Sequence, residues 1–362
     1  MSDVIDLTRR LVSIPSHEDD DPAGAAVARW LREETDAEVD RDDAGNVLAR
    51  KGSGPSLALV GHHDVVAPAE SQVAERDADG APTEMRIRRE DDRLYGRGTA
   101  DMKGTLAAAM VAFRDASPDC ELVLASFSGE ERGGVGAQAA IEAGFAPDYA
   151  VVGEGSTGYS ASGVTDVAVA HRGRRGSTLL ARGTAAHASE PDAGENAIYR
   201  ACDAADAVRA LSPPETTVLG HDLAGSVTVT EIDGGTAWNV IPDRCELTVD
   251  ERTVPGGRAA LDSVAALPGI EWTVDQDLPP MQCDDPAFAE AVLDAAADAQ
   301  DGDPELVTKP HATDAGWLSA AGTTCVVCGA AEPGEAHTDE ESVSVDVLER
   351  CTRIYRELAE SL

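Results

Sequence analysis

Two hydrophobic patterns alternate along residues 1–155, and this alternation limits the possible folds more than any other feature of the sequence. Asp3–Val12 and Pro22–Glu34 carry apolar residues at helical spacing, and residues 103–116 and 135–143 are also predicted to be helical. Strands that alternate with helices of this length predict βαβ units around a largely parallel sheet sandwiched by helices, an α/β fold. The apolar runs typical of strands lie at residues 46–50, 56–60, 121–128 and 149–152.

The middle of the chain has a different order of elements. Its patterns follow a βαββαβ-like sequence, which predicts a smaller α+β domain of the ferredoxin-like type. After it, helices are predicted at 286–299 and 344–362 around a strand at 323–327. We therefore expect an insert at 166–276 and one outer domain made of 1–165 and 277–362.

Acidic residues outnumber basic residues by 67 to 29, which gives a formal net charge of −38. Nucleic-acid-binding proteins normally carry a basic surface, and this sequence shows none. The 42% hydrophobic content argues against disorder despite the charge. An acidic, lysine-poor surface is typical of halophilic proteins, because molar salt screens charge repulsion to a few ångströms. Our hypothesis is a protein from a salt-rich cytoplasm.

Membrane insertion and secretion are both disfavoured. No window approaches the ~18 consecutive apolar residues of a membrane span, and the first residues lack the basic and apolar parts of a signal peptide. Seven cysteines form no dense, even framework, which fits a reducing compartment. Cys325 and Cys328 have CxxC spacing, but their apolar surroundings favour a strand over a metal or redox site. We expect a soluble, cytoplasmic protein.

Acidic and histidine side chains follow several predicted strands or precede predicted helices. Because ligands bind outside the carboxyl ends of the strands in open α/β sheets, these side chains are expected to converge. Taken singly, each of them is more often an ordinary surface or core residue than a ligand. Their joint pattern, with glycines beside them, is what favours a site. The residues are His62, Asp64, Asp101, Glu130, Glu131, Glu154 and His337.

Two neutral imidazoles and three carboxylates suit Zn²⁺ or a similar divalent ion. Three carboxylates and one hydroxide would nearly neutralise two such ions, which matters because isolated buried carboxylates are costly. A carboxylate between two ions about 3.5–4 Å apart is the usual two-metal arrangement. The remaining carboxylate, Glu130, would then be free to take a proton from water.

The stretches GHHDVV, YGRGTADMKG, SGEERGG, VVGEGST and EAHTDEE resemble five metal-site motifs of one family. It is the acetylornithine deacetylase, succinyl-diaminopimelate desuccinylase and carboxypeptidase G family of dinuclear metallo-amidohydrolases, here in a haloarchaeal-type form. The insert adds GTAAHASEPDAGENAI and GGTAWNVIPDRCELTVDER, so the resemblance covers almost the whole chain. It implies a zinc-exopeptidase-like fold with a dimerisation insert. It also implies two divalent ions, zinc or cobalt, with manganese as a further candidate.

The resemblance implies one set of metal ligands. His62 and His337 would each ligate one ion, and Asp101 would bridge the two ions. Glu131 and Glu154 would complete the two coordination spheres.

The resemblance also implies the residues that perform the chemistry. Glu130 would be the general base and then the acid that protonates the leaving amine, and Asp64 would accept a hydrogen bond from the first ligand's ring. His187 of the insert would reach the partner subunit's active site and stabilise the oxyanion. Asn239 and Arg252 match positions that hold the substrate, although a structural ion pair is an equal alternative for Arg252.

The sequence departs from the family pattern at two places next to the ligands. Gly129 stands where the family usually has Asp, and Gly155 stands where it usually has Pro. Both positions neighbour the metal-binding side chains without donating to a metal, so metal binding is still expected. The loop at 67–93 is unusually acidic and gives no guide to the substrate.

Together these observations predict a hydrolase that cleaves the amide of an N-acyl amino acid and acts as a homodimer. N-succinyl-diaminopimelate is the favoured substrate and N-acetylornithine the second. Dipeptides and carrier-linked lysine or ornithine are further alternatives. The alternative from another functional class is a binding protein that has this fold but no catalytic activity.

Overall fold

The computed structural model describes residues 2–18 and 22–362, which form two compact units. Unit 1 contains the residues up to Ala170 together with Gln282–Lys309 and Thr313–Leu362. Unit 2 contains His171–Met281 and Pro310–Ala312. The insert boundaries expected from the sequence, 166 and 276, each lie five residues before those of the long segment of unit 2.

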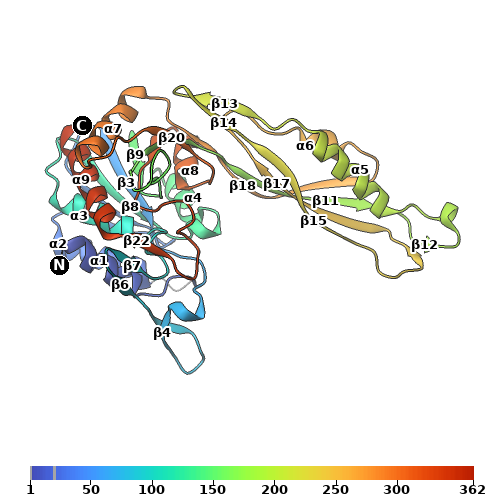
Figure 1. Ribbon diagram of the computed structural model, residues 1–362, viewed down its shortest axis with the longest axis horizontal. Helices are drawn as coiled ribbons and strands as arrows, with labels where there is room; N and C mark the ends of the chain where they lie inside the picture. The colour runs from blue at the N-terminus through green and yellow to red at the C-terminus, as the bar shows by residue number, and fades with distance from the viewer. Residues whose placement is uncertain (1, 19–21) are drawn as a thin grey trace. The chain divides into compact units, whose positions relative to one another are not determined.

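Unit 1 is built on a nine-stranded sheet (Figure 1). In spatial order its strands are β1 (Glu38–Arg41), β2 (Val47–Lys51), β8 (Glu121–Phe127), β3 (Ser56–His62), β9 (Tyr149–Val152), β21 (Thr324–Val327), β10 (Val167–His171) and β19 (Met281–Gln282), with β20 (Leu306–Lys309) beside β10. The central strands β8, β3, β9 and β21 are parallel, whereas β2 and β10 run antiparallel to their neighbours in this group. The prediction of an α/β fold with a mostly parallel central sheet is confirmed.

Helices cover both faces of this sheet, as Figure 1 shows. One group is α1 (Asp3–Val12), α2 (Pro22–Glu34), α3 (Lys103–Asp115), α7 (Pro286–Asp298) and α9 (Val345–Ser361), and the other is α4 (Val135–Glu142) and α8 (Asp314–Ala320). Helix α3 is buried almost all round because α1, α9 and β3 pack against it. The amphipathic patterns of α1 and α2 predicted both helices with the bounds that the structure shows.

A small three-stranded sheet links distant parts of unit 1. Strand β7 pairs with β6 on one side and with β22, near the C-terminal helix, on the other. This pairing brings the segment before α9 beside the loop that leads into α3. The strands are β6 (Arg88–Glu90), β7 (Arg93–Tyr95) and β22 (Ser342–Ser344), and the preceding segment holds the short helix η1 (Glu70–Gln72) and the hairpin β4 (Val73–Arg76) and β5 (Pro82–Met85).

Unit 2 is a four-stranded antiparallel sheet with helices α5 and α6, and its order is β15-β17-β11-β18. Burial alternates along β11 and β17, so one face of the sheet packs against the helices. The βαββαβ sequence and this strand order agree with the predicted ferredoxin-like insert. The elements are β11 (Arg174–Arg182), α5 (Ala197–Ala210), β15 (Ser226–Gly234), β17 (Arg244–Arg252), α6 (Leu261–Ala265) and β18 (Ile270–Leu278), with β12 (Ala186–His187), η3 (Pro191–Ala193), β13 (Glu215–Val218), β14 (His221–Ala224) and β16 (Val240–Ile241).

Within the described ranges, no helix combines the length and the apolar character needed to cross a membrane. All seven cysteines fall in these ranges and are free thiols. Cys325 lies in β21 and Cys328 directly follows it, both fully buried, and burial raises the pKa of both thiols well above the ordinary value. The CxxC pair therefore belongs to the core.

Candidate active site

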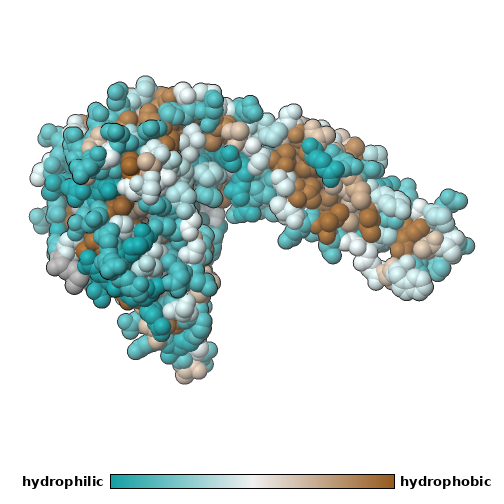
Figure 2. Space-filling model, viewed as in Figure 1, coloured by the Kyte–Doolittle hydropathy of each residue, from teal (hydrophilic) through white to brown (hydrophobic). Residues whose placement is uncertain are grey.

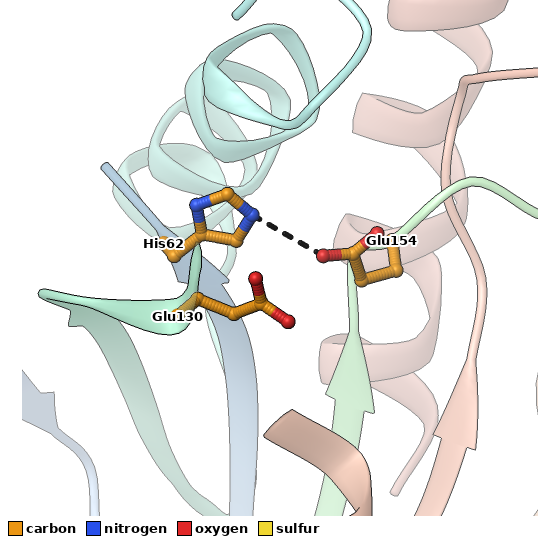
Figure 3. A group of neighbouring side chains, drawn as sticks. All are labelled: His62, Glu130 and Glu154. Atoms are coloured by element: carbon orange, nitrogen blue, oxygen red, sulfur yellow. Dashed lines mark ion pairs between the residues drawn. The ribbon is translucent and has the colours of Figure 1, made fainter. Parts of the chain in front are cut away.

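Three neighbouring parallel strands place the site side chains at one edge of the unit 1 sheet. Strand β3 ends at His62, β8 leads into the short helix η2 (Glu130–Arg132), and Glu154 follows β9. Because the strands are parallel neighbours, their carboxyl ends lie side by side. Figure 3 shows the side chains of His62, Glu130 and Glu154 directed toward one another.

The first candidate metal group is centred on the buried imidazole of His62. Its Nε2 lies 3.2 Å from Glu154 Oε1 and 2.9 Å from Asp101 Oδ1. Its Nδ1 lies 3.0 Å from the main-chain carbonyl oxygen of Asp64. A carbonyl can only accept, so Nδ1 donates to it. A divalent ion would take the place of the Nε2 proton that bonds Asp101, and the resulting neutral ring, protonated on Nδ1, is the tautomer that ligates a metal.

The second candidate group contains His337, Glu131 and Asp101. His337 Nε2 lies 2.9 Å from Glu131 Oε1 and 3.1 Å from Asp101 Oδ2. Asp101 therefore offers one oxygen to each group, as a bridging ligand would. Hydrogen bonds from the His337 ring to Asp101 and Glu131 raise the pKa of His337 to about 10, so protons compete with a metal for this ring at neutral pH.

The donor set fits two divalent cations. Asp101 is held well below its ordinary pKa: burial alone would raise it, but hydrogen bonds from His337 and His62 outweigh burial. Ionised carboxylates gathered in a partly buried site are costly unless cations balance them. Imidazole and carboxylate ligands are those that zinc and similar ions bind. The ligands predicted from the sequence thus lie together in two groups that share Asp101.

Glu130 lies against the first group and carries a strongly perturbed carboxyl. Burial raises its pKa well above the ordinary value, opposed by His62 and reinforced by the charges of Glu154 and Asp314. A carboxylate with a raised pKa accepts a proton and returns it more readily at neutral pH. This is the environment that a group serving first as base and then as acid requires.

The Asp64 carboxylate makes a further contact besides the expected one with the His62 ring. Its Oδ1 lies 3.5 Å from His62 Nδ1, and the Asp64 main-chain carbonyl oxygen lies closer, at 3.0 Å. The carboxylate also accepts from the backbone amides of Glu130 and Glu131, each at 3.2 Å. Asp64 therefore holds both the ring and the loop with the acidic pair.

Glu341 is a site residue that the sequence analysis missed. It is fully buried, and its Oε1 accepts from the backbone amides of Gly98, Ala100 and Asp101 at 2.8, 3.1 and 3.2 Å. Its Oε2 lies 2.6 Å from Arg97 Nη1. Glu341 thereby fixes the loop that carries the shared ligand. Glu341 is the last residue of the EAHTDEE stretch, but the sequence analysis gave it no role.

Asp314 is a second missed residue. It stands at the start of α8, is 2% exposed, and its pKa is raised to about 7 by burial and by the charges of Asp64 and Glu154. Thr313 caps α8 by accepting from Ala315 at 3.2 Å, which sets the direction of the Asp314 backbone. The sequence analysis left this acid without a role.

His187 and Asn239 lie together in unit 2. His187 Nδ1 accepts from the backbone amide of Ser189 at 3.2 Å, and the Ser189 hydroxyl lies 2.6 Å from the same nitrogen. A backbone amide can only donate, so the neutral ring carries its proton on Nε2; Asn239 Nδ2 lies 3.5 Å from this atom, and because both are donors they form no hydrogen bond in this tautomer. A protonated Nε2 is a hydrogen-bond donor of the kind that an oxyanion needs.

Arg252 forms the structural ion pair that the sequence left open. Its Nε and Nη2 lie 2.7 and 3.3 Å from the two carboxylate oxygens of Asp250. Arg174 also donates to Asp250 at 2.8 Å. The guanidinium of Arg252 is therefore engaged within unit 2, and its expected role in holding substrate stays a prediction.

A model of peptidase family M20/M25/M40 matches residues 58–361. The chain belongs to this family. Among its relatives, acetylornithine deacetylase from Myxococcus xanthus is 32% identical over 86% of this chain and 84% of its own length. Succinyl-diaminopimelate desuccinylase from Stenotrophomonas maltophilia is 29% identical over the whole of both chains. A putative [LysW]-lysine/[LysW]-ornithine hydrolase from Pyrobaculum aerophilum is 29% identical over 89% and 86%.

Solved structures agree with the M20 fold. Aminopeptidase PepT from Bacillus cereus superposes with a TM-score of 0.78 at 19% identity, covering 99% of this chain and 98% of that one. A dinuclear metal-binding M20 peptidase from Bacillus subtilis gives 0.68 at 17% identity, over 98% and 96%. M20 enzymes are dinuclear metalloenzymes, and this member is a hydrolytic enzyme that acts on amides. The alternative hypothesis, a binding protein without catalytic activity, is therefore rejected.

Proposed function

We propose that this M20 enzyme hydrolyses the amide bond of N-acyl amino acids, with N-succinyl-diaminopimelate as the first candidate substrate. The observation that carries the hydrolytic assignment is the placement of Glu130 beside the His62–Glu154 group, with its pKa raised by burial. The match to a succinyl-diaminopimelate desuccinylase along the full length of both chains supports the substrate. Acetylornithine and carrier-linked lysine or ornithine are the alternatives that the other relatives support.

The site residues have different roles in amide hydrolysis. Divalent ions held by the groups of His62 and His337 would polarise the acyl carbonyl and acidify water. Glu130 takes the proton of the attacking water and returns it to the leaving amine. His187 of the partner subunit would donate from Nε2 to the oxyanion of the tetrahedral intermediate, and Asn239 would orient the substrate. We propose zinc or cobalt for the two sites, with manganese as a third candidate, because imidazole and carboxylate ligands suit these ions.

Amine release from a panel of N-acyl amino acids tests the proposal. The panel contains N-succinyl-diaminopimelate, N-acetylornithine, dipeptides and carrier-linked lysine, assayed in molar KCl with added zinc or cobalt. Selective turnover of the succinyl substrate supports the desuccinylase assignment. Selective turnover of acetylornithine supports the same type of reaction but identifies acetylornithine as the substrate. Inactivity toward every member by the metal-loaded protein contradicts the proposed reaction class.

The homodimer expected from the sequence is also a proposal, supported by the surface of unit 2. Strand β15 is an edge strand and is largely exposed, so it presents unpaired backbone groups. Trp238, Tyr199 and Ile232 are 96%, 70% and 55% exposed. Hydrophobic residues gather over α5 and α6 in Figure 2. Exposed apolar area of this kind is typical of a surface that binds a partner.

We expect the dimer to depend on salt. Each subunit carries −38, and molar salt shortens the screening length to about 3 Å, so KCl removes the repulsion between subunits. Light scattering across a KCl series is expected to show a dimer at molar KCl and a monomer at low salt. Trp238→Ser is expected to shift the transition to higher salt, whereas Val135→Ser in unit 1 serves as control. A dimer at every salt concentration contradicts the salt dependence, and a monomer at molar KCl contradicts the dimer.

A further inference from the structure

Lys309 is a buried lysine beside the candidate metal groups, and it has no role in the proposed chemistry. The chain contains three lysines, and this one is the last residue of β20, at 6% exposure. Its Nζ lies 2.8 Å from the main-chain carbonyl oxygen of Gly155 and 3.6 Å from Glu154 Oε2. A buried ammonium is costly unless it is paired and hydrogen-bonded, and here both partners belong to the segment that carries a predicted metal ligand.

The two carboxylate oxygens of Glu154 lie next to different groups. Oε1 lies 3.2 Å from His62 Nε2, the contact that Figure 3 marks with a dashed line, whereas Oε2 is the oxygen near Lys309. An ion that takes the place of the proton on His62 Nε2 therefore meets Oε1 first. The ammonium attracts Oε2 and, as a nearby positive charge, makes the Glu154 carboxylate less basic.

The backbone around Gly155 fixes the position of the ammonium. The Gly155 carbonyl and the Ser156 amide belong to one planar peptide group. The carbonyl accepts from Lys309, and the amide donates to the Gly329 carbonyl oxygen at 3.1 Å. A Cβ at position 155 would lie 2.6 Å from the carbonyl oxygen of Ala331, so the segment is also closely packed. The acceptor of Lys309 is therefore held in place from both sides.

The number of oxygens that Glu154 gives to an ion matters for catalysis. A carboxylate can bind a cation through one oxygen or through both. Catalytic zinc sites keep one position open for water or substrate, in contrast to structural sites, which are closed. A second oxygen from Glu154 would occupy such a position. The contact between Oε2 and Lys309 opposes this mode of binding.

We propose that Lys309 is a positioning residue that holds Glu154 Oε2 away from the ion of the His62 group. Glu154 then ligates through Oε1 alone, and one position at the ion stays open for water or substrate. The inference rests on Glu154 as a metal ligand, as in the proposed function, and adds a residue that acts on the metal site through this ligand.

Lys309→Met tests the proposal, because it removes the charge and keeps a long side chain. Without the ammonium, Glu154 is expected to bind the ion through both oxygens. The visible absorption of the Co²⁺-loaded protein is then expected to weaken, because Co²⁺ with more ligands in a more symmetric site absorbs less. Affinity for the ion, measured by competition with a chelator, is expected to be equal or higher, because a nearby positive charge is gone. We expect kcat to fall by roughly 10–100-fold, the usual effect of losing a partner of a metal ligand.

Two further variants separate the charge of Lys309 from its hydrogen bond. Lys309→Gln keeps a donor for the Gly155 carbonyl without the charge, and it is expected to match Lys309→Met. Lys309→Arg keeps the charge, and it is expected to recover the absorption and part of kcat. Lys51→Met is the matched control, because Lys51 pairs with Leu122 near the start of β8, whereas the site lies beyond the end of that strand. It is expected to leave the absorption unchanged and kcat within about twofold.

The outcomes distinguish positioning from structural support. Wild-type absorption in Lys309→Gln overturns the proposal, because the hydrogen bond to Gly155 would then be sufficient. Weaker metal binding together with a lower Tm in Lys309→Met and Lys309→Gln also overturns it, because Lys309 would then only support the fold. Two ions retained by Glu154→Gln overturn its premise. Absorption and chelator competition need no substrate, so they test Lys309 even if the enzyme hydrolyses no member of the substrate panel.

Discussion

Replacing Glu130 with Gln is expected to lower kcat by a factor of about 10²–10⁴, the usual contribution of a general acid–base group. The amide keeps the size of the side chain but cannot take a proton from water. The metal content is expected to stay unchanged, because each candidate group keeps one imidazole and two carboxylates without Glu130. Steady-state amine release and elemental analysis of the same preparation measure both quantities.

The matched control for this variant is Glu142→Gln, at an exposed position of α4. It changes the formal charge by the same amount and is expected to leave turnover within about twofold, as surface substitutions usually do. Wild-type activity in Glu130→Gln would show that another group moves the proton. Loss of metal in this variant would instead place Glu130 among the ligands.

Replacing Asp101 with Asn is expected to abolish detectable turnover and to reduce the number of bound ions per chain from two to one or none. Asp101 offers one oxygen to each candidate group, so a single substitution weakens both. A ligand that binds only the folded state raises the Tm, so zinc or cobalt is expected to raise the Tm of the wild type and to raise that of Asp101→Asn much less. Metal stoichiometry and thermal unfolding measure these effects without an activity assay.

Variants that weaken only one of the two candidate metal groups make this test more specific. Glu154→Gln weakens the group of His62, and Glu131→Gln weakens the group of His337, so each is expected to retain one ion. Asp115→Asn, at the exposed end of α3, controls for the change in charge. Two ions bound by Asp101→Asn with wild-type affinity would contradict the bridging role.

The site residues that could be predicted from the sequence are those that lie at the carboxyl ends of strands. His62 and Glu154 stand within two residues of apolar runs, and the carboxyl ends of parallel strands meet in any sheet of this class. Likewise, the order of elements in the insert was enough to predict its sheet, because few topologies connect βαββαβ without crossing.

The supporting contacts could not be predicted in this way. The carboxylates of Glu341 and Asp64 accept hydrogen bonds from backbone amides. Nearly every residue has such an amide, so the sequence does not show which amide is the partner. Which acid reaches which amide depends on the pairing of β22 with β7 and on the φ of +75° at Gly129.

The hydrogen bond between Glu341 and Asp101, which are far apart in sequence, has a consequence for the order in which a newly synthesised chain folds and binds its ions. Its carboxylate holds the amide of Asp101 across 240 residues, and the long segment of unit 2 lies between them. On the ribosome, the loop of Asp101 emerges first and lacks its buried acceptor until residue 341 has followed. Domains generally fold as units during synthesis, so unit 2 can fold while the first half of unit 1 waits. Ion loading is then a late step of biogenesis, and ribosome-bound chains stalled before residue 337 carry only part of the ligand set.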